Sequence, residues 1–320
     1  MGVRLMARFG IVALGDLNCD LILVELENPP VPNREILAQS YNLTLGGSTG
    51  IFAAVSGGLG AKVGFVGLLG RDYFGDFLHA RLAEYGVDTG GIRRERDILT
   101  GLTVSLVREG ERALVTVLGS IAGLRPEDLP WDYIRQGRHL HLASYYLQTC
   151  LRPEIGGILA AARQAGMTTS LDPGWDPREE WDWPAVAALL PDVDIFLPNE
   201  TEALHLIGTA DINAALAAML AAGVGIVAVK QGAEGAIAGW GAERVKAPPL
   251  RINVVDTTGA GDSFDAGFVH AYLQGNDLAS CLEFANASGA LAACRVGGAD
   301  GAPTADDVIS FMHAAARRRV

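Results

Sequence analysis

The chain has 320 residues, of which 49% are apolar, so it can bury the core of one large domain or of two smaller ones. Charged residues make up only 19%, which excludes a long disordered acidic or basic chain. The formal net charge of −12 argues against a nucleic-acid-binding protein, although local backbone amides and a metal ion could still hold an anionic substrate.

Four cysteines are spread along the chain without a CxxC pair or a Cys/His cluster, so we expect neither a zinc site nor a disulfide framework. Free thiols suit a reducing compartment, and we therefore expect a cytoplasmic protein. Residues 1–16 lack the layout of a signal peptide. The longest uncharged run, 212–229, is divided by Gly223 and Gly225 and predicts a helix, a turn and a buried strand, so no membrane contact is expected.

The first third of the chain predicts two kinds of strand. Residues 9–14 are a short apolar run typical of a buried strand, whereas 21–45 contain three prolines and loose alternation, which favours edge strands outside the main core. Gly46 and Gly47 precede an apolar helix that ends near 57–60. A second buried strand and an amphipathic helix follow, and residues 100–119 predict a hairpin with its turn at 108–112.

From residue 139 onward, apolar runs and helical patterns alternate regularly. Strands are predicted at 139–144, 168–174, 193–199 and 225–232, with helices between them. This alternation predicts an α/β fold with a mostly parallel sheet that is covered by helices on both faces. Ligands bind such sheets beyond the carboxyl ends of the strands. The candidate loops are therefore 15–20, 46–49, 172–178, 198–202, 230–235 and 256–262.

The segment 254–275 carries the strongest functional signal. Its β-branched residues predict a short strand that ends at Asp256, followed by a turn with Gly259 and Gly261 and then a helix. Glycines at such a turn let the backbone come close to a ligand, and a helix N-terminus offers unpaired N–H groups to an anion. The sequence has no Walker motif and no GxGxxG, so we expect the phosphate site at residues 257–262.

Asp262 lies at the start of this predicted helix and has two interpretations. Aspartate is a favoured helix N-cap, so its role can be structural. Beside an anion site, however, a carboxylate can take the proton of an attacking hydroxyl while the amides stabilise the charge on a transferring phosphate.

The segment DTTGAGDSF, residues 256–264, resembles the C-terminal signature of the ribokinase-like (PfkB) carbohydrate kinases. Other motifs that resemble this family follow the family order along nearly the whole chain: GDLNCD at 15–20, GGS at 46–48, the segment 64–89, TG at 100–101, PNETEA at 198–203, KQGAEGA at 230–236 and FANASGALAACRVGGA at 284–299. The resemblance implies one ribokinase-like kinase domain over 1–320, with a central mostly parallel sheet sandwiched by helices. It also implies a small β lid formed by two segments, about 17–45 and 98–119.

The same resemblance implies an ATP-dependent sugar kinase and a role for individual residues. Asp262 would be the general base, beside an anion hole formed by the amides of Gly259, Ala260 and Gly261. The nucleotide would be bound by Asn199, Lys230, Gly232, Gly235, Thr257 and Asn286. Mg²⁺ would be held by Asn199 and Glu202, partly through water, and a monovalent cation such as K⁺ by Asp256 and Thr258 with carbonyls near 293–299. Without the resemblance, these residues are ordinary turn and helix-end residues.

On the sugar side, the resemblance implies that Asn18 and Asp20 bind substrate hydroxyls, close to the backbone of Gly46 and Gly47. A carboxylate and an amide together offer the acceptors and the donor that a vicinal diol needs. The proline-containing edge strands would expose backbone pairing groups, so we also expect a homodimer that pairs through the lid. Sugar and ATP are then the expected small-molecule partners, without nucleic acid.

Four positions depart from the family pattern. Ile51 stands where many members have an asparagine that contacts the sugar, and Ala143-Ser144-Tyr145 replaces a segment that has a glutamate in ribokinases. Asp265 stands where asparagine is more usual, and Asp176 stands where relatives acting on sugar acids have an arginine. Without that arginine a carboxylate-bearing sugar loses its natural partner, so we expect a neutral sugar or a sugar-like polyol.

Two alternatives stay open at this point. A nucleoside kinase on the same scaffold could pack a base against Ile51, Phe52, Tyr145 and Tyr146. A catalytically silent sugar-binding protein is a second alternative, but Asp262 and the glycines of its turn disfavour it.

Overall fold

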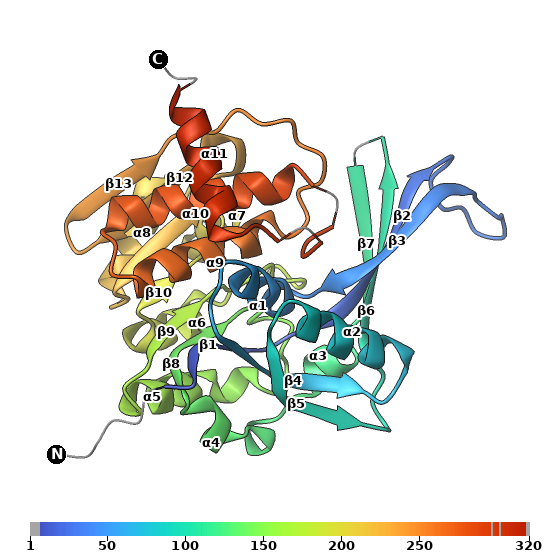
Figure 1. Cartoon of the computed structure of the whole chain (residues 1–320), viewed down its shortest axis with the longest axis horizontal. Helices are drawn as coiled ribbons and strands as arrows, with labels where there is room; N and C mark the ends of the chain where they lie inside the picture. The colour runs from blue at the N-terminus through green and yellow to red at the C-terminus, as the bar shows by residue number, and fades with distance from the viewer. Residues whose placement is uncertain (1–6, 110, 296, 301, 318–320) are drawn as a thin grey trace.

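A nine-stranded sheet runs through the middle of the computed structural model, which describes residues 7–109, 111–295, 297–300 and 302–317 (Figure 1). Its strands are, in spatial order, β13 (Glu243–Ala247), β12 (Ala236–Trp240), β11 (Ile226–Lys230), β10 (Ile195–Phe196), β9 (Thr168–Leu171), β8 (Gly137–Leu142), β1 (Phe9–Leu14), β4 (Val63–Gly70) and β5 (Asp88–Glu95). Pairing is parallel from β11 to β5 and antiparallel only at β12 and β13. The mostly parallel sheet is therefore confirmed.

Helices cover both faces of this sheet, because alternate strand residues are buried on opposite sides. In β1, Ile11 and Ala13 belong to one apolar core, and Val12 and Leu14 belong to the other. The first core is closed by α1 (Ser48–Gly58), α2 (Tyr73–Glu84), α9 (Ala260–Leu273), α10 (Leu278–Ala293) and α11 (Ala305–Arg317). The second is closed by α4 (Trp131–Ile134), α5 (Ile155–Gln164), α6 (Trp183–Leu189), α7 (Glu200–Ile207) and α8 (Ile212–Ala221).

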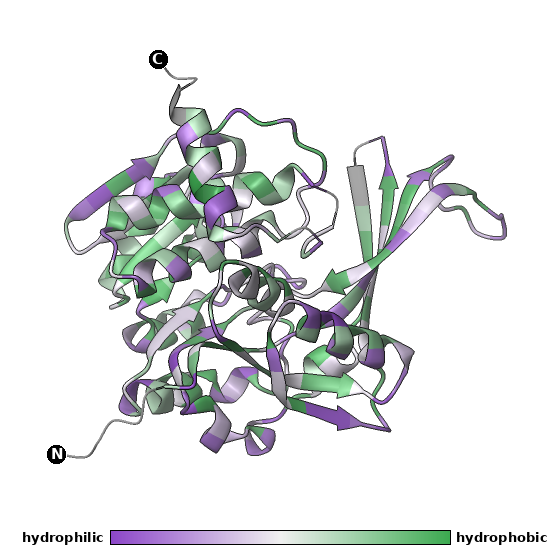
Figure 2. Ribbon diagram, in the orientation of Figure 1, coloured by the Kyte–Doolittle hydropathy of each residue, from purple (hydrophilic) through white to green (hydrophobic). Residues whose placement is uncertain are grey.

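A second, four-stranded sheet projects from the main body (Figure 1). It is formed by β3 (Ala38–Gly46), β2 (Asn18–Leu26), β6 (Gly101–Arg108) and β7 (Glu111–Val117), in that spatial order. Figure 2 shows mixed hydrophilic and hydrophobic colouring on this sheet, whereas β4 of the main sheet is mostly hydrophobic. We call it the small sheet. Its strands come from the two segments in which the sequence predicts edge strands and a hairpin.

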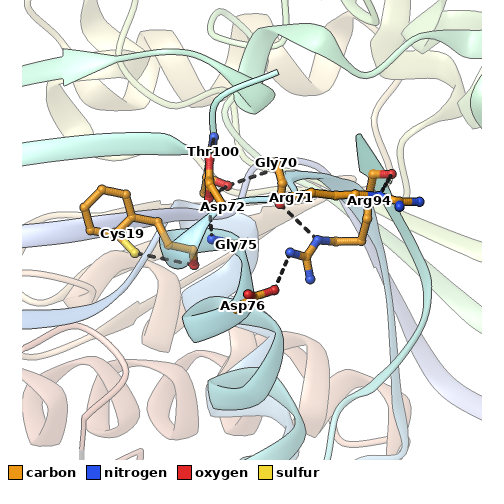
Figure 3. A network of polar contacts seen from close by, with 9 residues as sticks. Cys19, Gly70, Arg71, Asp72, Gly75, Asp76, Arg94 and Thr100 are labelled. Atoms are coloured by element: carbon orange, nitrogen blue, oxygen red, sulfur yellow. Dashed lines mark hydrogen bonds and ion pairs between the residues drawn. The ribbon is translucent and has the colours of Figure 1, made fainter. Parts of the chain in front are cut away.

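Polar contacts fix the base of the small sheet to the main sheet (Figure 3). Asp72 caps α2 by accepting from the Gly75 amide at 2.8 Å, and it also accepts from the amide and hydroxyl of Thr100 at 2.8 and 2.7 Å. The Thr100 hydroxyl in turn accepts from the amide of Gly70, the last residue of β4, at 3.0 Å. Although burial opposes ionisation, these hydrogen bonds lower the pKa of Asp72. The start of β6 is therefore held by a half-buried carboxylate.

Two sequence expectations fail. The predicted strand ending at Asp256 does not form, because Val254 and Val255 are exposed and pair with no strand while the chain crosses from β13 to α9. The edge strand β5 was not predicted, since its sequence DTGGIRRE is largely polar and has no apolar alternation.

The four cysteines are free thiols, as expected. Within the described ranges, no single helix has the length and apolar character to cross a bilayer; only the pair α7 and α8, bent by 67°, meets those criteria jointly. The N-terminal segment expected to lack a signal peptide lies partly outside the described residues, and the cytoplasmic location stays a prediction.

Candidate active site

The turn before α9 is shaped by a close approach of two glycines. Gly259 has a left-handed φ of 71°, and a Cβ at this position would lie 2.6 Å from the Cα of Gly298. The Ala260 amide donates to the Thr257 carbonyl at 3.2 Å. The amides of Gly259 and Gly261 have no hydrogen-bond acceptor among the described residues. Two of the three predicted anion-hole amides thus have no acceptor among the described residues, and the third donates a hydrogen bond within the turn.

Asp262 is the third residue of α9, so it is not the N-cap, which is Gly259. The side chain is half-buried and lines a cavity beside the turn. Burial and the nearby negative charges of Asp172 and Asp16 raise the pKa of Asp262 to about 8, while the Lys230 ammonium ion opposes that shift. A carboxylate with a raised pKa at a cavity is suited to accept a proton.

The cavity has a volume of about 250 Å³ and lies between the α9 turn, the start of α1 and the small sheet. Its lining combines carboxylates, hydroxyls and aliphatic side chains, and no lysine or arginine is among the described residues that form it: Asp16, Asn18, Asp20, Ile22, Gly47, Ser48, Ile51, Thr103, Ser105, Leu114, Thr116, Ile121, Ser144, Leu147, Thr258, Gly259 and Asp262. The cavity therefore offers hydrogen bonds to hydroxyl groups and has no cationic partner for an anion.

Asn18 and Asp20 lie together in this cavity, on β2. The Asn18 side-chain amide donates to Asp20 Oδ1 at 2.8 Å and to the Thr103 hydroxyl at 3.3 Å. A Cβ at Gly46 would lie 2.3 Å from the Asp20 carboxyl group, and one at Gly47 would lie 2.9 Å from Asn18 Oδ1. The two glycines are therefore required by the packing of these side chains.

Asp16 is a cavity residue that the sequence did not single out. Its carboxylate accepts from the amides of Ser48 and Thr49 at 3.0 Å each, from the Thr49 hydroxyl at 2.7 Å and from the Ser144 hydroxyl at 2.9 Å. Ser144 has a left-handed φ of 55°, which is unusual for a non-glycine residue. With four donors around it, Asp16 fixes the start of α1 and is a poor candidate for the base.

Asn199 and Glu202 form a capping box at the start of α7. Glu202 N donates to Asn199 Oδ1 at 2.9 Å, and Asn199 N donates to Glu202 Oε2 at 2.8 Å. Glu202 is buried, and this burial together with the charge of Asp172 raises its pKa to about 7. Both residues lie beside the end of β11, since Asn199 forms a β-bridge with Lys230. Their oxygen atoms suit Mg²⁺, and the same two side chains also cap α7.

Lys230 lies below the α9 turn and points to two aspartates. Its ammonium group donates to Asp172 Oδ2 at 2.7 Å and to the two oxygens of Asp265 at 3.0 and 3.1 Å. Although burial favours the neutral amine, these carboxylates raise the pKa of Lys230. The sequence predicted Lys230 as a nucleotide contact and did not predict either ion pair.

Comparison with known proteins then decides the family. The family model described as pfkB family carbohydrate kinase matches residues 9–305. An ATP-dependent ribose-1-phosphate kinase of Halopiger xanaduensis is 33% identical over 310 residues, which cover 94% of this chain and 97% of that protein. The chain belongs to the pfkB family of carbohydrate kinases.

Solved structures agree with this family membership. Arabidopsis thaliana ribokinase in complex with ribose and ATP has a TM-score of 0.83 at 28% identity, covering 95% of this chain and 98% of its own. The E. coli protein called ribokinase II, in complex with ATP and Mg²⁺, has a TM-score of 0.84 at 26% identity, covering 95% and 99%. The expected ribokinase-like fold is therefore confirmed.

In this carbohydrate kinase, the predicted nucleotide residues lie around the end of β11 and the outer face of α10. Gly232 and Gly235 have left-handed φ angles of 56° and 89°, and a Cβ at Gly235 would collide with the Ala247 carbonyl. Asn286 donates to the Pro248 carbonyl at 3.0 Å and lines an apolar slot with Leu250 and Met312, among others. Thr257 is exposed beside the turn. An apolar slot that contains a side-chain amide suits a purine base.

The side chains proposed for a nucleoside base are not gathered at the cavity beside Asp262. Phe52 is fully buried and stacks on His141 with 3.5 Å between ring centroids. Tyr145 and Tyr146 line a different cavity, with Arg152 over both rings. Of these four side chains, Ile51 alone lines the cavity beside Asp262, so the aromatic argument for a nucleoside kinase loses its basis.

Further hydroxyls of the cavity were also missed. Thr103 and Ser105 on β6 and Thr116 on β7 face the same cavity as Asp20 on β2. Alternation along each strand places these residues on one face, but the pairing register that unites them is not visible in a single strand.

Proposed function

We propose that this kinase transfers the γ-phosphoryl group of ATP to a hydroxyl of a neutral sugar or sugar-like polyol, with Asp262 as general base. The observation that carries the proposal is the position of Asp262. Asp262 lies in the first turn of α9, beside the free amides of Gly259 and Gly261, and its side chain lines a cavity that also contains Asn18 and Asp20. One carboxylate thus faces both an anion site and a polyol site, as phosphoryl transfer requires.

Each group in this arrangement has a defined task. Asn18 and Asp20 would hold the diol, so that one hydroxyl lies against Asp262, and Asp262 would take its proton as the oxygen attacks. The amides of Gly259 and Gly261, at the N-terminus of α9, would stabilise the negative charge on the phosphoryl oxygens. The small sheet would act as a lid that excludes water as a competing acceptor.

Mg²⁺ would be held by Asn199 and Glu202, partly through water. Both supply oxygen atoms near the proposed phosphate site, and retained waters suit this small, strongly hydrated ion. When bound, Mg²⁺ neutralises charge on the phosphates of ATP. The adenine would lie in the slot at Asn286, and Gly232, Gly235 and Thr257 would line the phosphates or the ribose.

The acceptor is proposed to be neutral because of the charges in the cavity. Asp16, Asp20 and Asp262 contribute carboxylates, and no described lining residue is cationic. Asp176, which replaces an expected arginine, accepts from the amides of Arg178, Glu180 and Trp181 and holds a turn together. A phosphate or carboxylate on the sugar would have no counter-ion here. The proposed acceptor therefore differs from ribose 1-phosphate, the compound in the name of the Halopiger relative.

A substrate panel tests this proposal. ADP release should be measured with Mg-ATP and each of several pentoses, hexoses, polyols, nucleosides, sugar acids and ribose 1-phosphate. We expect at least one neutral sugar or polyol to be phosphorylated with a kcat/KM roughly 10-fold or more above every anionic compound. A clear preference for ribose 1-phosphate would contradict the neutral acceptor, and no ADP release above background with any compound would contradict the kinase function itself.

We also propose that a monovalent cation, K⁺, binds beside Asp256 and Thr258. Asp256 accepts from the amide and hydroxyl of Thr258 at 2.9 and 2.7 Å and from the Gly297 amide at 3.0 Å, so it joins two loops whose carbonyl groups could bind such an ion. Replacing K⁺ by tetramethylammonium should lower kcat, and equal rates in both salts would exclude this site.

A homodimer through the small sheet is proposed on its exposed apolar residues. Tyr41 on β3 and Val115 and Val117 on β7 are exposed and lie on the two edge strands. Val115→Lys should convert a dimer to a monomer in sedimentation at micromolar concentration. Trp240→Lys, at a residue 58% exposed against 59% for Val115 but on the main sheet, is the matched control. A wild-type monomer would exclude the dimer.

A further inference from the structure

Three charged side chains meet underneath the α9 turn, and the proposed function does not yet use them. Lys230 ends β11, Asp172 follows β9, and Asp265 lies one turn along α9 from Asp262. Since β10 lies between β9 and β11, the lysine side chain reaches across the end of β10 to Asp172. We call these three residues the Lys230 cluster. It joins two strands of the main sheet to the helix that carries the proposed base.

The three side chains of the cluster are largely buried. The side chains of Lys230, Asp172 and Asp265 are 11%, 8% and 1% exposed. Buried charges are costly unless they are paired and hydrogen-bonded, and the three ammonium donors find three carboxylate oxygens at 2.7–3.1 Å. Removing one partner would leave a buried charge without compensation. The three side chains are therefore held in their paired arrangement.

The cluster also contacts the turn that forms the proposed anion site. A Cβ placed on Gly261 would lie 3.7 Å from Lys230 Cδ and 3.8 Å from Nζ, so the lysine side chain lies along the inner side of this turn. Asp172, Asp262 and Asp265 each offer an oxygen within 4.8 Å of the others. The same ammonium group thus lies close to the anion-hole backbone and to the base.

We propose that Lys230, Asp172 and Asp265 are positioning residues for phosphoryl transfer: by ion pairs across β9, β11 and α9, they hold the first turn of α9, with Asp262 and its free amides, in the reactive geometry. This inference rests on the proposed function. It assigns Lys230 a place behind the turn and not a direct contact with the nucleotide.

Asp265 stands where asparagine is more usual in the family pattern, and both side chains can serve in this cluster. Two carboxyl groups share one ammonium ion, and burial raises the pKa of Asp265 well above its usual range, whereas Lys230 lowers that of Asp172 against the effect of burial. A protonated Asp265 can donate to Asp172 and accept from Lys230. An asparagine side chain can do the same with its amide, which explains physically why either residue can stand here.

The charged groups around Asp262 predict how the cluster affects its ionisation. Asp172 and Asp16 raise its pKa and Lys230 lowers it. Asp265 faces Lys230 from α9, and Glu202 faces it from α7. On β8, buried His141 is held neutral because burial lowers its pKa. Removing Lys230 should therefore shift the pH dependence of kcat to higher pH, and Asp172→Asn should shift it to lower pH.

The test compares kinetics and melting for wild type, Lys230→Met, Asp265→Ala and Asp265→Asn with the best neutral sugar. Lys230→Met and Asp265→Ala should lose roughly 10- to 100-fold in kcat, the usual cost of misplaced reacting groups, with KM for ATP changed by less than about 3-fold. Asp265→Asn should restore most of the kcat lost in Asp265→Ala. The opposite pH shifts of Lys230→Met and Asp172→Asn are a readout that a purely structural role would not produce.

Two results would overturn the inference. One is a Lys230→Met protein with near wild-type kcat; the other is a Lys230→Met protein whose KM for ATP rises strongly at unchanged kcat, since that would make Lys230 a nucleotide contact. If Lys230→Met folds poorly, the double variant Lys230→Met/Asp172→Asn, which removes both charges, should melt higher than Lys230→Met alone. Additive melting shifts would contradict the cluster. This arm needs no activity, so it separates failure of the cluster from failure of the proposed kinase function.

Discussion

The proposed phosphate side and the proposed sugar side of the site are built differently. On the phosphate side, the groups lie on α9 and on strand ends of the main sheet, and buried ion pairs connect them. On the sugar side, Asn18, Asp20 and several hydroxyls lie on a small projecting sheet that is fixed mainly at its base, around Asp72 and Thr100 (Figure 3). In the proposed function, the reacting groups would therefore lie on the main sheet and α9, and the groups that select the acceptor would lie on the small sheet.

The largest effect should come from Asp262→Ala, on the phosphate side. We expect a loss of roughly 10²–10⁴-fold in kcat, the usual range for a positioned base. The KM for ATP should change little, because backbone amides and Mg²⁺ would hold the phosphates. A folded variant with near wild-type turnover would contradict the assignment of the reacting base to the phosphate side.

A change on the sugar side should act on a different kinetic parameter. Asn18 is buried and hydrogen-bonds Asp20 and Thr103, so Asn18→Ala should raise the KM for the sugar by about 5- to 150-fold, the effect of 1–3 kcal/mol. The KM for ATP should stay within about 2-fold. Equal increases in both KM values would show that the two sides are not separable.

Glu202→Gln should have a smaller effect, limited to magnesium. Glutamine can still accept from the Asn199 amide, so the capping box and the melting temperature should be nearly preserved. The Mg²⁺ concentration for half-maximal rate should rise about 10-fold, the lower end of the usual loss of metal affinity when a group at a metal site is changed. An unchanged magnesium profile would count against a ligand role for Glu202.

The smallest predicted effect is on stability. Because the folded-state pKa of Asp262 is raised to about 8, the protonated form stabilises the fold at low pH, and this contribution is lost between about pH 4 and pH 8. Asparagine cannot ionise. Asp262→Asn should therefore melt about 2–8 °C above wild type at pH 8.5 and close to it at pH 4. A lower melting temperature at pH 8.5 would contradict the buried-charge account.

The sequence predicted the parts of the site that lie in one continuous segment. The run from Asp256 to Phe264 predicted the turn and the helix, because glycines and an acid at a helix start have a local physical meaning, and it supplied Asp262 as the proposed base. The strand before Asp256 was wrong, because β-branched residues favour a strand only where a neighbouring strand can pair with them.

Contacts between distant segments were the part that could not be predicted. Asp16 holds Ser144, and Lys230 holds Asp172 and Asp265, through pairings set by strand order in the main sheet. A lysine at a strand end gives no sign of its partner, because the crossover helices separate residues that adjoin in space. The fold could therefore be predicted from the sequence, whereas the arrangement of charged groups around Asp262 could not.

The pH dependence of turnover tests the central claim, that Asp262 is the base, most directly. With the sugar and Mg-ATP both well below their KM values, the rate reports ionisation in the free enzyme. It should rise with pH to half its maximum near pH 8, and this rise should be absent from the residual activity of Asp262→Asn. A wild-type profile that is flat between pH 6 and 9, or a rise that persists in Asp262→Asn, would contradict the account.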